Sequence, residues 1–110
     1  MENLENEEME KLTKNSMAIS AYEMGQLQDQ LHDWHVEKKD NINQLYRNFT
    51  FDNFIQALEF TNKVGALAEE YNHHPAIVTE WGKVQVRWWT HVVSGLYKND
   101  FVMAAKTECL

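Results

Sequence analysis

The stretch Glu69–Trp89, EEYNHHPAIVTEWGKVQVRWW, marks the place where a helix should end and a sheet should begin. A long amphipathic run precedes it, and Pro75, the only proline of the chain, disfavours helical geometry at the residue before it. We therefore expect the helix to end before His74. Junctions between elements carry functional residues more often than element interiors do, and two adjacent histidines, His73 and His74, stand at this one.

Alternating apolar residues predict four strands around this junction. The expected strands, in chain order, are Trp34–Val36, Ile42–Phe49, Ile77–Trp81 and Lys83–Trp89. Gly82 lies where a tight turn would join the last two strands, and Lys38–Asn41 reads as a turn between the first two. Neither side of Ile42–Phe49 is cleanly apolar, so we expect one face of this strand to be wetter than the other.

Caps and helical periodicity predict three helices. The expected helices run from about Ala21 to Gln30, from Phe54 to just before His74, and from about Asn99 towards the C-terminus. Gly65 would weaken the second helix in isolation, which suggests that it packs closely on the sheet. The order α-β-β-α-β-β-α, with hairpin-linked strands, predicts an α+β fold in which the helices pack on one face of a four-stranded antiparallel sheet.

Length and charge favour one acidic domain. The 110 residues fit a single domain, which we expect to span residues 20–110. Residues 1–19 are rich in Glu and Asn and carry no sustained apolar stripe, so we expect a mobile acidic leader. A short helix packed on a neighbour is the alternative for this segment. The formal net charge of −7 and the lack of a basic face disfavour nucleic acid as a partner.

Cysteine usage and hydropathy limit where the protein should work. Cys109 is the only cysteine, so an internal disulfide is excluded. No apolar run approaches the length of a membrane span, and the chain does not begin with a basic segment followed by an apolar one. We therefore expect a cytoplasmic protein without a membrane partner.

Four residues are candidates for chemistry, namely His73, His74, His91 and Asp100. Imidazole titrates near neutrality, so a pair of histidines can donate to one atom and accept from another. Plainer roles exist, because a histidine can satisfy carbonyls at a helix end and an acid is favourable in the first turn of a helix. Adjacent histidines project in different directions and no HExxH or Cys/His spacing occurs, so we expect no metal.

The common signatures of other enzyme classes are absent from the chain. GxGxxG, GxxxxGK[ST], GxSxG and CxxC do not occur, which removes the usual nucleotide, phosphate, serine-hydrolase and dithiol interpretations. We therefore expect the three histidines and the aspartate to converge on one pocket.

A longer constellation that contains these residues resembles a known family. Its members are Glu69-xxx-His73-His74-Pro75, Trp81-Gly82-Lys83-Val84, Thr90-His91, Gly95-Leu96 and Asp100. This set is similar to that of the pterin-4a-carbinolamine dehydratases, also called 4a-hydroxytetrahydrobiopterin dehydratases, of the bacterial type. The resemblance extends from about Leu31 to Lys106, whereas the leader does not match well.

The resemblance implies a hydro-lyase that removes water from a 4a-hydroxytetrahydropterin and leaves a quinonoid dihydropterin. Such enzymes recycle the cofactor of aromatic amino-acid hydroxylases, and they need no metal and no organic cofactor of their own. The resemblance also implies a homodimer or a homotetramer, and four short strands leave two edges that invite pairing. Mammalian members also bind a transcription factor, so a non-catalytic dimerisation or coactivator module is the alternative function.

The expected site residues follow from this resemblance. We expect the pterin to contact Asn72, His73, His74, Pro75, Trp89, Thr90 and His91, with Glu69, Trp34 and Trp81 in support. Loss of hydroxide needs a general acid, and a ring nitrogen must lose its proton to a base. We assign these transfers to His74 and His91 and orientation or assistance to His73. Asp100 would hold one histidine in a single tautomer.

Overall fold

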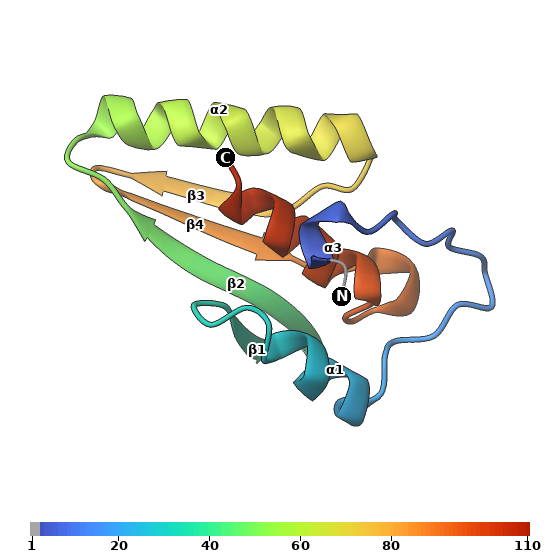
Figure 1. The fold of residues 1–110 in the computed structure, drawn as a ribbon. Helices are drawn as coiled ribbons and strands as arrows, with labels where there is room; N and C mark the ends of the chain where they lie inside the picture. The colour runs from blue at the N-terminus through green and yellow to red at the C-terminus, as the bar shows by residue number, and fades with distance from the viewer. Residues whose placement is uncertain (1–2) are drawn as a thin grey trace.

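The computed structural model describes residues 3–110 as a four-stranded antiparallel sheet with three α-helices (Figure 1). The helices are α1 (Ala21–Gln28), α2 (Phe54–Tyr71) and α3 (Lys98–Glu108), and the strands are β1 (His35–Lys39), β2 (Ile42–Thr50), β3 (Ala76–Glu80) and β4 (Lys83–Trp88). Two short 3-10 segments, η1 (Leu4–Asn6) and η2 (His91–Val93), accompany them. The strand order is β1-β2-β4-β3, and the α+β prediction is confirmed.

The helices cover one face of the sheet. Along β4, Val84, Val86 and Trp88 are fully buried, while the residues between them are partly exposed. α2 packs on β3 and β4, and α3 packs on β4 and β2 (Figure 1). The hydroxyl groups of Thr61 and Thr79 share a hydrogen bond of 2.6 Å between α2 and β3. The alternation that predicted this strand therefore reports which side faces the helices.

Both hairpins turn through two residues. Asp40 and Asn41 have φ values of 52° and 65°, the left-handed geometry that joins antiparallel strands tightly. Because this turn needs only two residues, β1 stays paired through Lys39 and is longer than the predicted Trp34–Val36. In the second turn Gly82 has a φ of 72°, and its carbonyl accepts from the N–H of Phe51 at 2.8 Å.

Within the expected leader, residues 4–10 lie along α3. Leu4 of η1 is only 4% exposed, and Met9 packs against the core. For residues 4–6 the structure thus has the alternative, a short helical turn packed on a neighbour. This cover, added to that of the sheet, buries Met103 and Ala104 as well as the predicted apolar residue Phe101. One amphipathic stripe was therefore too narrow a description of α3.

No helix among residues 3–110 combines the length and the apolar character that crossing a bilayer requires.

Candidate functional site

The end of α2 turns the two histidines in different directions. Asn72 follows the helix in the left-handed conformation, with a φ of 50°. Asparagine tolerates this conformation better than most residues and commonly ends helices. The N–H of His73 donates to the carbonyl of Ala68 at 3.1 Å, and the chain then passes through Pro75 into β3. The helix ends before His74, as predicted.

His73 points inwards and is held on two sides. Its Nε2 lies 2.7 Å from Oδ1 of Asp100. Its ring stacks on the indole of Trp88, with centroids 5.7 Å apart and planes inclined by 13°. Only 11% of the His73 side chain is exposed. These contacts leave the imidazole little freedom to rotate.

Asp100 is completely buried and accepts three hydrogen bonds. Its Oδ2 accepts from the hydroxyl of Thr90 at 2.8 Å and from the N–H of Tyr97 at 2.9 Å, and Oδ1 faces His73. Because a carboxylate oxygen accepts, this contact favours the His73 tautomer whose proton is on Nε2. Asp100 also lies in the first turn of α3, where negative charge is favourable. Asp100 thus has the favourable place at a helix start that any acid could take, and it also holds His73.

His74 and His91 are both exposed and approach the site from different elements. Nε2 of His74 is hydrogen-bonded to Oε2 of Glu69, one turn back on α2. Glu69, which we expected to support the site, thus lies against His74. His91 begins η2, and its ring lies beside the indole of Trp89 with centroids 5.3 Å apart. The loop that contains His91 is closed because the N–H of Thr90 donates to the carbonyl of Gly95 at 2.8 Å.

A hollow of about 220 Å³ brings most of the expected residues together. Its walls are formed by Leu12, Asn72, His73, His74, Trp89, Thr90, His91 and Val92. Asp100 stands behind His73 and Thr90 rather than at the surface of the hollow. Pro75 is next to this hollow in the chain without lining it. Sequence reasoning missed Leu12 and Val92, and the isolated apolar character of Leu12 in the leader was the available signal.

Two of the expected supporting residues lie elsewhere. Trp34 is buried, and its indole N–H donates to Oε1 of Glu108 at 2.7 Å. Trp81 occupies the β3–β4 turn and is 73% exposed. Neither lines the hollow, so the structure places both tryptophans away from the gathered histidines. Trp34 matched the family pattern because it anchors the end of α3, which is a structural role.

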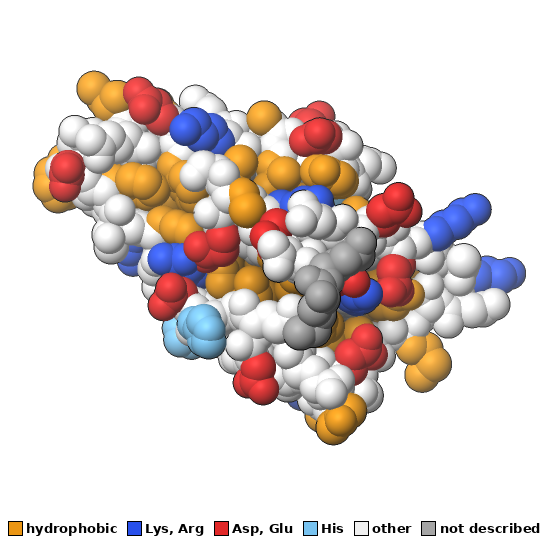
Figure 2. All heavy atoms as spheres, viewed as in Figure 1, with side chains coloured by type: hydrophobic (Ala, Val, Ile, Leu, Met, Phe, Trp, Pro, Cys, Tyr) orange, Lys and Arg blue, Asp and Glu red, His pale blue; other side chains and the backbone are white. Residues whose placement is uncertain are grey.

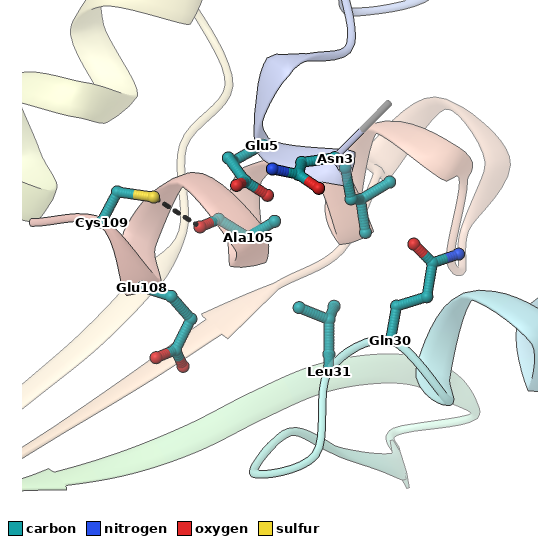
Figure 3. Close-up of a pocket in the computed structure, with 8 residues that line it drawn as sticks. Asn3, Glu5, Gln30, Leu31, Ala105, Glu108 and Cys109 are labelled. Atoms are coloured by element: carbon teal, nitrogen blue, oxygen red, sulfur yellow. Dashed lines mark hydrogen bonds between the residues drawn. The ribbon is translucent and has the colours of Figure 1, made fainter. Parts of the chain in front are cut away.

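A larger hollow of about 500 Å³ lies between the leader, the end of α1 and α3 (Figure 3). Apart from the exposed thiol of Cys109, its polar lining consists of Asn3, Glu5, Gln30 and Glu108, with no histidine. It therefore offers no acid and base near neutrality. Within residues 3–110, no three His, Cys, Asp or Glu side chains gather closely enough to hold one metal ion.

The smaller hollow, in contrast, has the parts for proton transfer on a flat ring. Two exposed imidazoles can exchange protons with a bound molecule, a third is oriented by a buried carboxylate, and the indole of Trp89 offers an apolar wall. Sites of this kind are concave and combine an apolar lining with a few convergent polar groups.

Comparison with known proteins agrees with this geometry. Residues 17–110 match the family model for pterin 4 alpha carbinolamine dehydratase. Relatives provisionally named pterin-4-alpha-carbinolamine dehydratase occur in Nitrosococcus oceani (49% identity over 110 residues, covering 100% of this chain and 97% of the relative) and Syntrophotalea carbinolica (47% over 110 residues, covering 100% and 98%).

A solved structure shares the fold as well. The structure described as a transcriptional coactivator/pterin dehydratase from Brucella melitensis superimposes with a TM-score of 0.74 and 28% identity, and the match covers 84% of this chain and 96% of that chain. The family model and the relatives span nearly the entire sequence, and the hollow contains the histidines of the family pattern. The chain therefore belongs to the pterin 4 alpha carbinolamine dehydratase family.

Proposed function

We propose that this protein removes water from a 4a-hydroxytetrahydropterin and releases the quinonoid dihydropterin. One observation carries the proposal: His74 and His91 lie on the same hollow as His73, whose ring is tied to the buried carboxylate of Asp100. A buried acid that holds one imidazole in place beside two exposed imidazoles suits acid–base chemistry on a bound molecule, in addition to its role at the start of α3.

The reaction needs two proton transfers at different atoms. The bond between C4a and oxygen breaks, and the departing hydroxide takes a proton from a general acid to become water. A ring nitrogen gives its proton to a general base, and its electron pair forms the new double bond to C4a. His74 and His91 serve as this acid and base. The proton of the acid leaves with the water, the base takes the ring proton, and exchange with solvent restores both imidazoles, so no proton is consumed overall. His73 fixes the ring through hydrogen bonding and stands ready to assist.

The proposed reaction places the enzyme after an aromatic amino-acid hydroxylase, whose spent cofactor it would return to a reducible form. It requires neither a metal nor an organic cofactor, because imidazoles perform both transfers near neutral pH. The pterin is the only small-molecule partner that the mechanism needs.

Replacing the histidines one at a time tests the proposal. Purified protein is mixed with an enzymatically generated 4a-hydroxytetrahydropterin, and the decay is followed by ultraviolet absorbance. We expect His74→Ala and His91→Ala each to lower kcat by about 10²-fold or more, the usual contribution of a general acid or base. His32→Ala, an exposed histidine away from the hollow, is the control. Wild-type rates in His73→Ala, His74→Ala and His91→Ala together would refute the assignment.

A non-catalytic interaction module is the second candidate. It is favoured by the coactivator description of the Brucella melitensis protein and by three exposed apolar residues on α2, namely Phe54, Ile55 and Leu58. The same absorbance assay separates the two, because a module without activity would leave the decay of the pterin at its uncatalysed rate.

A further inference from the structure

The leader reaches the candidate site, although neither the motif nor the mechanism uses it. Residues 3–12, here called the strap, run along α3 towards the hollow (Figure 1). Figure 3 shows Asn3 and Glu5 of its first turn lying over α3 beside Ala105. The strap ends at Leu12, which is half-buried and lines the hollow together with the three histidines.

Side chains of α3 fasten the strap at several points. Nζ of Lys106 donates to the carbonyl of Glu5 at 2.6 Å, and Nζ of Lys98 donates to Oε1 of Glu7 at 3.0 Å. The hydrogen bond to Glu7 raises the pKa of Lys98, burial opposes the rise, and the charges of Glu7 and Glu10 add to it. The raised pKa means that the contact with Glu7 favours the charged form of Lys98.

A third fastening is a buried side-chain amide that pairs with the strap backbone as a neighbouring strand would. Asn99 is only 2% exposed, and its side chain pairs with both groups of the Glu10 backbone. The N–H of Glu10 donates to Oδ1 at 2.7 Å, and Nδ2 donates to the carbonyl of Glu10 at 2.9 Å. A buried amide left without these partners would be unfavourable, so the pairing fixes the strap two residues before Leu12.

Adjacent residues of α3 thereby position two walls of one hollow. Asn99 holds the strap that ends in Leu12, and Asp100 holds His73. We propose that Leu12 is a substrate-contacting residue, held by the strap as an apolar wall against the flat ring. This inference rests on the proposed function for the identity of that ring. Leu12 supplies apolar contact and keeps water from one side of the imidazoles, which strengthens their hydrogen bonds to the substrate.

Shortening the side chain measures this contact. Leu12→Ala is expected to raise KM about fivefold and to leave kcat within about twofold, because the contact exists equally in the ground state and the transition state. Met17→Ala is the matched control, since Met17 is an apolar leader residue that is 79% exposed and lies outside the hollow. A KM equal to that of the wild type in Leu12→Ala overturns the inference and leaves the dehydratase assignment standing.

A double-mutant cycle tests the strap itself. Asn99→Asp keeps the acceptor for the N–H of Glu10 but removes the donor to its carbonyl, so the strap should loosen and KM should rise. In Leu12→Ala/Asn99→Asp we expect a KM no higher than that of the worse single variant. Both substitutions remove the same contact between Leu12 and the substrate, so their effects should not multiply. If the two increases in KM multiply, or if Asn99→Asp lowers only kcat, Asn99 acts through α3. Either result would overturn the proposal that Asn99 positions Leu12 through the strap.

Binding of 7,8-dihydrobiopterin, measured by calorimetry, separates failure of the inference from failure of the proposed function. If the wild-type protein binds this pterin more tightly than the Leu12→Ala variant does but shows no dehydration, Leu12 contacts the pterin and the proposed reaction is wrong. A wild-type protein that neither binds nor dehydrates pterins overturns both.

Discussion

At the scale of single residues, Asp100 connects the start of a helix to the candidate site. Its two oxygens accept from His73, Thr90 and the backbone of Tyr97, so one carboxylate caps α3 and orients an imidazole. Both duties require full burial, because water would otherwise compete for the same lone pairs. The position therefore couples stability to function.

Asp100→Asn should damage both properties. The amide has nearly the same shape, but it lacks the charge and directs two donors towards groups that themselves donate. We expect kcat to fall on the order of 10²-fold and stability to fall by about 1–3 kcal/mol. Absorbance assays and thermal unfolding would measure the two effects. The exposed acid Asp52 supplies the control as Asp52→Asn. An active Asp100→Asn with an unaltered pH profile would remove Asp100 from the mechanism.

At the scale of elements, the turns decide where helices and strands can meet. The left-handed residue Asn72 ends α2 and sends the two histidines apart, and Gly82 allows β3 and β4 to pair through a two-residue turn. At Gly82 an added Cβ would also meet the carbonyl oxygen of Phe51 at 3.0 Å. At Gly65 nothing lies within 4 Å of such an atom, so α2 packs on the sheet without a close approach at this glycine.

These two glycines predict opposite responses to the same substitution. Gly82→Ala should destabilise the fold by about 1–2 kcal/mol, because the left-handed conformation is strained for alanine and the Phe51 carbonyl must move. Gly65→Ala should be neutral or stabilise by up to about 1 kcal/mol, since alanine favours the helix and has free space. Urea unfolding compares them. Equal stability changes in the two variants would show that the turn geometry is unimportant.

At the scale of the whole molecule, the sheet has two unpaired edges and the surface below α2 is partly apolar. The order β1-β2-β4-β3 leaves β1 and β3 as edges, and unpaired edges invite association. Figure 2 shows hydrophobic side chains gathered below α2, where a hollow is lined by Phe49, Phe51, Phe60 and Leu110 among others. A domain of this size has a modest core, so further burial between copies would add appreciable stability.

The protein should therefore associate with itself. Light scattering coupled to gel filtration should give a molar mass of twice or four times that of one chain at micromolar concentration. Hydrogen exchange should then be slower along β1 or β3 than a free edge allows, because amides that pair across copies are protected. A single-chain mass across the accessible concentrations would contradict this expectation.

The amino-acid sequence alone determined the features that depend on neighbouring residues in the chain. Pro75 predicted that α2 ends before His74, and period-two alternation identified β4 and its buried face. The family pattern singled out His73, His74, His91 and Asp100 as candidates. These signals act over a few residues or belong to a motif, so they can be read along the chain.

Contacts between distant segments were decided only by the tertiary structure. Asp100 pairs with His73 rather than with another histidine, and Leu12 lies beside the histidines. Trp34 contacts Glu108 instead of the site, and Trp81 also lies away from it. These placements depend on residues far apart in sequence. Such contacts depend on how the elements pack, because the free energy of burying a side chain is set by whatever lies opposite it. The contacts between the strap and α3 could not be predicted from the residues of the leader, because they depend on side chains of Lys98, Asn99 and Lys106.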